Sequence, residues 1–390
     1  MSYKRINQKD FDIILALIEN PASTDVEITE FLNNLPNQDK QYVNTTVHRR
    51  IKKLEDEEIV LGATAELNNQ VLGLEQHSFL ISFPTENKTK NMEVFTQFCN
   101  EHPYTSYHNR IYGAWNGMYV VFTIPVVTEA ERWLIESLNT LKSNSILEDF
   151  THFPKLSRVN GSKGNLKDWD AEFNRWKVNF SAIFEYLNSS ENEPILKDKA
   201  EISKVINNLS MFDMILMREF TNNARRSQKE MLADILSSND YSYERKEIPV
   251  TKQSISRRIN HLKELNIFES YSLYYSRESF GIFNELLFVG PRDELDIIRL
   301  NRIIENGLLP FECNLYELKD KFLFWIVIPP VEALELTELL TSHFDNLQVH
   351  FLGRHPARYF FWHRNFDTES KTWKSSEKWM KTVPMDTLGL

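Results

Sequence analysis

Apolar residues in the first sixty positions recur with the period of amphipathic helices. After Asp10, a candidate N-cap, they stand at i, i+3, i+4 and i+7: Phe11, Ile14, Leu15 and Ile18. The same spacing predicts a second helix over 24–34 and a third over 44–57, and the β-branched run IVLGATAEL at 59–67 predicts a short hairpin. Three helices followed by a β-wing are typical of a winged helix-turn-helix.

From residue 76 the pattern alternates between strand and helix periods. The expected elements, in chain order, are strand 76–83, helix 90–102, strands 105–113 and 116–125, helix 128–141 and strand 146–153. This order, βαββαβ, predicts a ferredoxin-like antiparallel sheet with two helices on one face. The same order recurs from NELLFVG at 284 to QVHFLG, which ends at 353.

The chain contains this module twice. YVNTTVHRRIKKLEDEEIV at 42–60 corresponds to VTKQSISRRINHLKELNIF at 250–268, with an offset of 208 residues, and FDIIL corresponds to FDMIL with an offset of 201. Further landmarks follow in the same order: Gly73 with Gly281, Tyr112 with Tyr316, and Pro125 with Pro329. Two copies at so long a period indicate a duplicated two-domain module and not a solenoid.

We therefore predict an α+β fold, a tandem duplication of a winged helix-turn-helix plus a ferredoxin-like βαββαβ domain, which makes one chain a pseudo-dimer. The predicted domains are winged helix 1 at 1–68, βαββαβ domain 1 at 69–155, a Trp-containing extension and linker at 156–205, winged helix 2 at 206–272, βαββαβ domain 2 at 273–355, and an aromatic and basic C-terminal extension at 356–390.

Two motifs of the winged helices resemble a known family. They are D-x-I-L in helix one and V-x-R-R-I-x-x-L in helix three, present as Asp12, Ile14, Leu15, Val47, Arg49, Arg50, Ile51 and Leu54, and again as Asp213, Ile215, Leu216, Ile255, Arg257, Arg258, Ile259 and Leu262. With a βαββαβ (RAM-like) domain behind them, they resemble the Lrp/AsnC (feast/famine) transcription regulators. The resemblance covers about 1–155 and 206–355 and implies a sequence-specific regulator that binds double-stranded DNA.

The net charge of −10 over 390 residues conceals two basic islands, one from Lys40 to Leu54 and one from Arg245 to Lys263. Because phosphate neutralisation dominates affinity for DNA, the location of charge matters more than its total. The side chains predicted to contact DNA are Asn44, Thr45, His48, Arg49, Arg50, Lys52, Lys53, Thr251, Lys252, Gln253, Ser256, Arg257 and Arg258. We expect paired βαββαβ domains to hold the two reading heads apart, in a monomeric pseudo-dimer or a homodimer of it.

A small-molecule effector is a further expectation from the resemblance, since the family's βαββαβ domains often bind amino acids near their shared edges. The family's glycine-then-aspartate turn is only partly present, and the effector residues predicted are Tyr112, Gly113 and Trp115.

Two other classes of function stay open beside the regulator. Siroheme decarboxylases resemble this family, can fuse two such modules and use His and Arg on the middle strands, which His108 and Arg110 would supply here. The third class is a protein-docking scaffold. The sequence shows no zinc spacing and no nucleophile–base pair, so we expect no metal, no cofactor, no catalytic residue and no enzyme activity.

The cysteine content predicts the location of the protein, and the tryptophan-rich extensions predict a packing role. With only Cys99 and Cys313, and no apolar run of membrane length, a cytoplasmic location is expected. The extensions at 155–176 and 354–379 place Trp169 and Trp373 at an offset of 204. They could stack on nucleic acid, dock a partner or cap a sheet, and we favour capping because large aromatics more often pack than bind.

Overall fold

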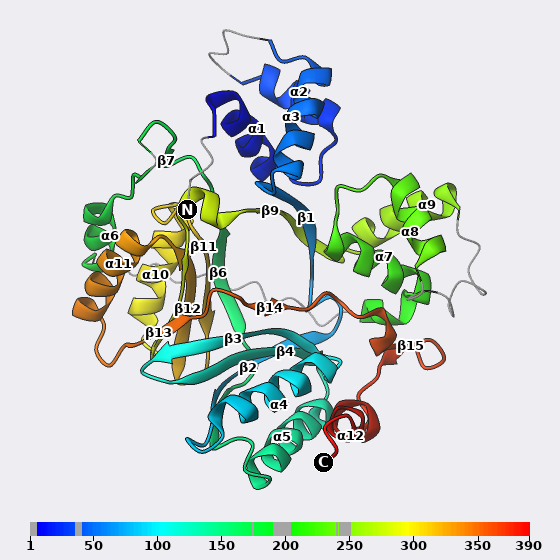
Figure 1. Ribbon diagram of the computed structural model, residues 1–390, viewed down its shortest axis with the longest axis vertical. Helices are drawn as coiled ribbons and strands as arrows, with labels where there is room; N and C mark the ends of the chain where they lie inside the picture. The colour runs from blue at the N-terminus through cyan, green and yellow to red at the C-terminus, as the bar shows by residue number, and fades with distance from the viewer. Residues whose placement is uncertain (1–5, 36–40, 174, 190–203, 239–240, 242–250) are drawn as a thin grey trace. The chain divides into compact units, whose positions relative to one another are not determined.

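The computed structural model describes residues 6–35, 41–173, 175–189, 204–238, 241 and 251–390 (Figure 1). Contacts divide the chain into two compact units. The helical unit comprises Met1–Asn68, Asn165–Lys177 and Leu209–Ile282, and the sheet unit comprises Asn69–Gly164, Val178–Asn208 and Phe283–Leu390. None of the helices described is both long and apolar enough to cross a membrane. The six predicted domains remain a proposal about the division of the chain.

The helical unit contains two heads of three helices each. Head one is α1 (Gln8–Glu19), α2 (Asp25–Asn33) and α3 (Asn44–Asp56), and head two is α7 (Met211–Asn222), α8 (Gln228–Ser237) and α9 (Lys252–Glu264). Capping boxes begin α2 at Thr24 and α8 at Ser227, because the side chain of the cap and the third helical residue satisfy each other's backbone N–H. The apolar faces point inward as predicted, with Val47 and Ile255 fully buried.

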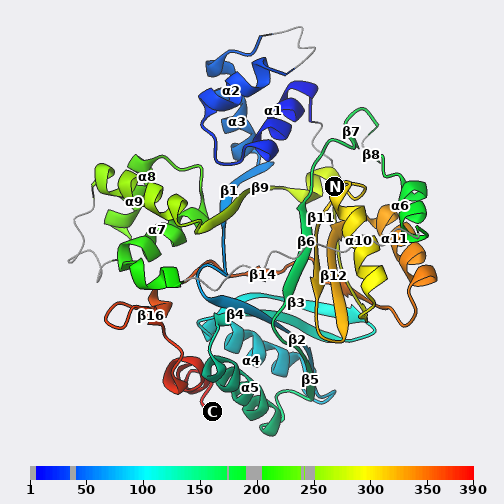
Figure 2. The ribbon, with the colours of Figure 1, turned by 180° about the vertical axis from the view of Figure 1, so that it is seen from behind.

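The predicted wing hairpins are wrong, because each copy provides one strand and the two strands pair with each other. β1 (Val60–Leu67) runs antiparallel to β9 (Phe268–Tyr275), with Ala63 opposite Leu273. The same ribbon binds α7, since the Thr64 hydroxyl donates to the Thr221 carbonyl at 2.6 Å. A strand that is too short to fold back on itself is stabilised here by its copy (Figure 2).

The sheet unit contains both βαββαβ repeats, and the predicted α+β tandem duplication is confirmed. Repeat one is β2 (Leu74–Ser82), α4 (Lys88–Glu101), β3 (Thr105–Gly113), β4 (Gly117–Pro125), α5 (Thr128–Ser143) and β5 (Asp149–Phe153). Repeat two is β10 (Asn284–Pro291), α10 (Glu294–Glu305), β11 (Glu312–Glu317), β12 (Lys321–Ile328), α11 (Pro330–His343) and β13 (Gln348–Leu352). Their strand orders, β5-β2-β4-β3 and β13-β10-β12-β11, are the same, and we call them half-sheets one and two.

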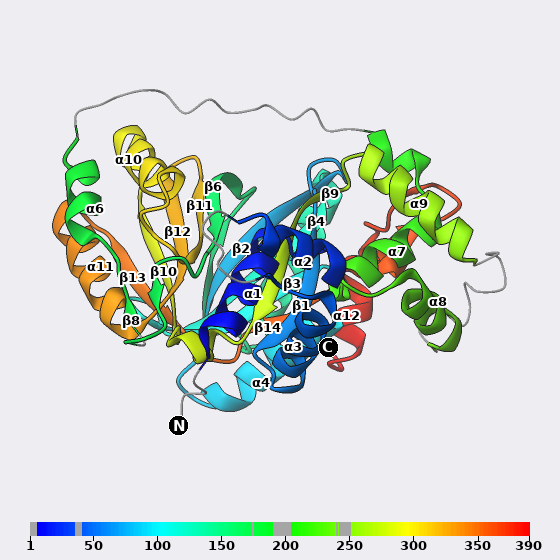
Figure 3. The ribbon, with the colours of Figure 1, turned by 90° about the horizontal axis from the view of Figure 1, so that it is seen from above.

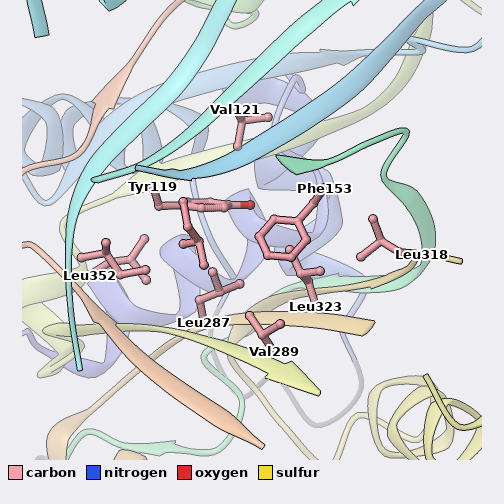
Figure 4. Close-up of a cluster of buried hydrophobic side chains, with 10 residues drawn as sticks. Tyr119, Val121, Phe153, Leu287, Val289, Leu318, Leu323 and Leu352 are labelled. Carbon is pink, nitrogen blue, oxygen red and sulfur yellow. The ribbon is translucent and has the colours of Figure 1, made fainter. Parts of the chain in front are cut away.

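The two half-sheets form one ten-stranded sheet through β3 and β13, where Phe351 pairs with Tyr112. They also pack face to face: one buried cluster joins side chains of half-sheet one, such as Tyr119, to side chains of half-sheet two, such as Leu287 (Figure 4). We call the faces that carry this cluster the inner faces. The helices lie on the outer faces (Figure 3). Phe98 of α4 packs against Phe122 of β4 there.

Each extension attaches to the other repeat. After repeat one, β6 (Ser157–Lys163) pairs with β11, and α6 (Phe180–Leu187) packs on α10 and α11. After repeat two, β14 (Ala357–Arg358) pairs with β3, and a π-helical turn (Lys378–Thr382) with α12 (Val383–Asp386) packs on α5 and α4. The short 3-10 helices are Lys204–Asn208, Arg277–Phe280 and His363–Asn365. The exchange ties the two repeats into one body.

The tryptophans of the extensions cap two turns. The hairpin β7 (Trp169–Asp170) and β8 (Arg175–Trp176) directs the Trp176 indole N–H to the Phe280 carbonyl at 2.9 Å. The hairpin β15 (Phe366–Asp367) and β16 (Thr372–Trp373) directs Trp373 to the Leu72 carbonyl at 2.7 Å. Trp176 and Trp373 are therefore the equivalent tryptophans of the two extensions. The correspondence of Trp169 with Trp373 that the 204-residue offset predicted is wrong.

Candidate functional site

Two arginines predicted to contact DNA are bound inside their own heads. Arg50 donates from Nη1 to Asp10 Oδ1 at 2.5 Å, and Arg258 donates from Nε to Asp213 Oδ1 at 2.7 Å. The Asp10 side chain is 4% exposed and the Asp213 side chain 0%. Because a buried carboxylate needs a paired cation, these arginines stabilise the heads. Their assignment as DNA contacts stays a prediction.

The Arg–Asp pairs also correct the alignment of the first helix. Asp213 is the third residue of α7, and Asp10 is the third residue of α1, so the two acidic partners are 203 residues apart. Asp12, which the FDIIL match places opposite Asp213, instead accepts from the Tyr42 hydroxyl at 2.8 Å.

The other predicted DNA contacts lie at the surface of the two heads. Exposed are Asn44, Thr45, His48, Arg49, Lys52, Lys53, Thr251, Lys252, Gln253 and Arg257, and Ser256 is half-buried. Several have contacts within the protein. His48 Nδ1 lies 2.6 Å from an oxygen of Asp25, whose other oxygen accepts from Arg225 at 2.8 Å. Thr251 is the N-cap of α9. Exposure alone leaves their role untested.

The predicted effector residues lie at the end of β3. Tyr112 is exposed, and Trp115 packs against the inner-face cluster. Gly113 has a φ of 115°, and a Cβ there would lie 2.6 Å from the Val349 carbonyl oxygen. Glycine is therefore needed for the close approach of β3 and β13, and effector binding stays a prediction.

The pair suggested by the decarboxylase resemblance, His108 and Arg110, lies on the outer side of β3. His108 Nε2 is 2.9 Å from the Tyr359 hydroxyl, which in turn donates to Asn100 of α4. Burial lowers the pKa of His108. Arg110 is exposed. Neither side chain faces the space between the half-sheets.

A different polar group lies on the inner faces, and the sequence analysis missed it. Glu285 of β10 is 5% exposed, and its Oε1 accepts from the Tyr107 hydroxyl at 2.5 Å and from the Trp325 indole N–H at 2.7 Å. Asn109 donates from Nδ2 to the Tyr107 oxygen at 3.2 Å and to the Gly353 carbonyl at 2.7 Å. We call Glu285, Tyr107, Trp325 and Asn109 the Glu285 cluster. Its one sequence signal is a glutamate directly before the apolar run LLFV of the strand NELLFVG.

The electrostatics of the Glu285 cluster keep Tyr107 protonated. Burial, the adjacent Glu285 charge and its hydrogen bond raise the pKa of Tyr107 well above its usual range. Basic side chains adjoin the cluster from the second extension. Arg358 is the register partner of Tyr107, and the exposed Arg354 lies over the ring of Phe283, 5.6 Å from its centroid. A buried carboxylate and a neutral phenol thus lie together, with the guanidinium-bearing Arg358 opposite the phenol in the strand pairing.

His350 is a second buried polar residue on the inner face. It lies opposite Leu287 in β10 and Gly113 in β3, and it is 0% exposed. Neither ring nitrogen has a hydrogen-bond partner among the described residues. Burial lowers the pKa of His350 to about 4, so the imidazole is neutral at physiological pH.

The two half-sheets can be aligned residue by residue through their strand pairing. The alignment starts from Pro125 and Pro329, which lie at the ends of the equivalent strands β4 and β12. Equivalent pairs are Gln76 with Glu285, His77 with Leu286, Val121 with Trp325, Asn314 with Tyr107, His152 with Val349 and Phe153 with His350. The position equivalent to the Glu285 cluster therefore has an amide in place of the carboxylate, and valine in place of tryptophan. The cluster is a property of one side of the pseudo-dimer.

Comparison with known proteins gives whole-chain matches to one enzyme. The crystal structure of the siroheme decarboxylase NirDL is 11% identical, covers 98% of this chain and 100% of its own, and has a TM-score of 0.50. The same enzyme in complex with an iron-uroporphyrin III analogue is 11% identical, covers 97% and 99%, and has a TM-score of 0.51. An AsnC family transcriptional regulator from Agrobacterium tumefaciens is 14% identical over 38% of this chain and 88% of its own, with a TM-score of 0.31. The chain matches no family model and no curated protein.

These matches overturn two predictions. The chain was expected to be a DNA-binding transcription regulator and not an enzyme, but the structures that match its whole length are those of a decarboxylase. The likeness to NirDL establishes a shared fold, a winged helix-turn-helix plus a ferredoxin-like domain in two copies.

Proposed function

We propose that this protein is a tetrapyrrole-modifying enzyme, of the kind to which the fused siroheme decarboxylases belong. The observation that carries the proposal is the whole-length correspondence of the duplicated architecture to NirDL, a protein solved with an iron-uroporphyrin III analogue. The Glu285 cluster supports it, because a buried carboxylate and a neutral phenol on the inner faces are groups that can exchange protons.

The chemistry around the cluster fits an anionic macrocycle. A tetrapyrrole of this class has a flat aromatic centre and a rim of carboxylates. Tyr107 and Trp325 are half-buried aromatic side chains that can pack against such a plane, and Arg354 and Arg358 are exposed cations that can pair with its carboxylates. The inner-face cluster fills the centre of the interface, so we expect the macrocycle to enter beside β14.

Decarboxylation requires a proton at the carbon that the carboxylate leaves. Loss of carbon dioxide leaves an electron pair on that carbon, and one proton must be delivered to it. Tyr107 is held protonated, and its hydroxyl lies 2.5 Å from Glu285, so the two can pass a proton between them. We assign Glu285 and Tyr107 to proton transfer, and Asn109 to holding Tyr107.

The small-molecule partner is then the tetrapyrrole itself. A reducing cytoplasm remains part of the proposal, since Cys99 and Cys313 are both free and buried. The winged helices contribute the β1–β9 ribbon and internal ion pairs.

The test is incubation of the purified chain with siroheme and, separately, with iron-uroporphyrin III, followed by mass spectrometry of the macrocycle. We expect loss of carbon dioxide from siroheme, and absorption changes on titration with either compound. Arg354→Ala with Arg358→Ala should weaken binding at least tenfold, which is about 1.4 kcal/mol.

The matched control is Gln76→Ala, which alters the equivalent position of the other half-sheet. It should leave binding and product formation unchanged. No spectral change with either macrocycle would remove the proposal, whereas binding without loss of carbon dioxide would restrict it to a tetrapyrrole-binding role.

A further inference from the structure

A second polar group lies on the outer side of half-sheet one and is separate from the Glu285 cluster. His77 of β2, His152 of β5 and Glu131 of α5 place one ligand atom each within 4.8 Å of the others. His77 Nδ1 and His152 Nε2 are 2.9 Å apart. His77 is fully buried and the other two are half-buried. No metal site was expected from the sequence, because His152 and Glu131 are 75 and 54 positions from His77 and form no zinc-type spacing.

Both histidine rings are held in position. His152 stacks on Phe79, with 4.4 Å between ring centroids and 4° between planes. His77 Nε2 lies 3.1 Å from Glu75 Oε1, and the other oxygen of this carboxylate, Oε2, lies 3.9 Å from Lys155 Nζ. A carboxylate that accepts a hydrogen bond from Nε2–H favours the tautomer whose lone pair is on Nδ1, the nitrogen that faces His152. This carboxylate–histidine arrangement is typical of the second shell of metal sites.

The fold itself does not require these histidines. In half-sheet two the equivalent residues are Leu286 and Val349, in the same strands and the same pairing. The copy without a histidine pair folds with aliphatic side chains, so the pair is an addition to repeat one. Repeat one thus spends a buried carboxylate contact and a ring–ring contact on polar groups that repeat two folds without, which favours a functional role for the pair.

From this geometry we propose that His77, His152 and Glu131 bind a divalent transition metal ion, with Zn²⁺ as the best match. Two imidazole nitrogens and one carboxylate oxygen suit Zn²⁺, which leaves a fourth position for water. Tetrahedral ligation separates two nitrogens by about 3.3 Å, so the rings need move apart by only a few tenths of an ångström. When the ion binds, the proton on Nε2 of His152 moves to Nδ1 of the same ring, so the charge of the imidazole is unchanged.

The location defines the role of the ion. β5 is the edge strand of the sheet, and α5 covers the same half-sheet, so the ion joins an edge strand, its neighbour β2 and a helix. It lies on the face opposite the Glu285 cluster. We assign it a structural role in holding β5 and α5 to β2, which is independent of the proposed enzyme activity.

The experiment uses the full chain after removal of metal with a chelator. Zn²⁺ alone is titrated by calorimetry, and Co²⁺ alone by visible absorption, which reports nitrogen and oxygen ligands. We expect one ion per chain and a higher melting temperature with Zn²⁺. The paired substitutions His77→Leu and His152→Val install the residues of repeat two, so they should preserve the fold and abolish binding.

Two further variants keep the result decisive. Glu75→Gln should weaken Zn²⁺ binding about 10–100-fold while stoichiometry is retained. His102→Gln alters a buried histidine outside the site and should leave binding unchanged. No stoichiometric uptake of either ion, or uptake that survives the paired substitution, overturns the proposal.

Discussion

The two repeats of this chain share a fold and differ in chemistry. Both place four strands in the same order under two helices, and both are completed by an extension from the other repeat. Yet repeat one has His77 and His152 where repeat two has Leu286 and Val349, and repeat two has Glu285 where repeat one has Gln76. Apolar periodicity therefore maintains the architecture, while isolated polar residues at buried positions give each repeat side chains that the other lacks.

The largest expected effect tests a feature that the two heads share. Arg258→Ala leaves the buried Asp213 without its cation, so it should destabilise the helical unit by about 3–5 kcal/mol. Arg50→Ala should cost less, because Lys53 Nζ still lies 3.8 Å from Asp10 Oδ2. Urea unfolding followed by circular dichroism measures the loss. The adjacent exposed residues provide the control: Arg49→Ala and Arg257→Ala should change stability by less than about 0.5 kcal/mol. If Arg50→Ala and Arg258→Ala cost no more stability than these two controls, the buried pairs contribute little to the stability of the heads.

The next effect sharpens the difference between the half-sheets. Glu285→Gln retains the shape and one acceptor of the side chain but removes its charge, so decarboxylation should slow about 100-fold, or about 2.7 kcal/mol. Single-turnover measurements with siroheme separate this loss from binding. When Gln76→Glu is added to Glu285→Gln, it introduces a carboxylate at the equivalent position of half-sheet one and should not restore the rate. Full activity of Glu285→Gln would remove this residue from proton transfer.

Acid sensitivity distinguishes His350 from its counterpart Phe153. The pKa of His350 is about 4 in the folded protein and about 6.5 when unfolded, so below pH 6.5 the unfolded chain binds more protons. Stability is full above pH 6.5 and falls as the pH drops toward 4. By pH 5 the loss is about 2 kcal/mol. His350→Phe should remove this part of the pH dependence in urea unfolding at pH 7 and pH 5, and an unchanged slope would contradict it.

The smallest effect tests the exchange of the extensions. Trp176→Phe and Trp373→Phe each remove one buried indole hydrogen bond to a carbonyl, so each should cost about 1 kcal/mol. Thermal unfolding measures both. Equal losses would support equivalent capping hairpins. Trp362→Phe, a half-buried tryptophan outside the two hairpin pairs, should have a smaller effect.

The sequence determined the elements and their duplication. Helical and strand periods located βαββαβ twice within a few residues, because side-chain burial repeats with the backbone period. The 208-residue offset identified the two copies, and the whole-chain matches share this duplicated architecture. The decarboxylase resemblance was also available from the sequence, but the basic helix-three motif favoured DNA binding, and the buried partners Asp10 and Asp213 could not be read from it.

Only the tertiary structure decided which residues meet. The wing strands pair between copies, the extensions exchange, and Tyr107 reaches Glu285 across 178 positions of sequence. His77 meets His152 because β2 and β5 are neighbours in space while a helix, two strands and another helix separate them along the chain. Periodicity records only whether a residue is buried. The partner of a buried polar group depends on strand order and register, which long-range packing sets.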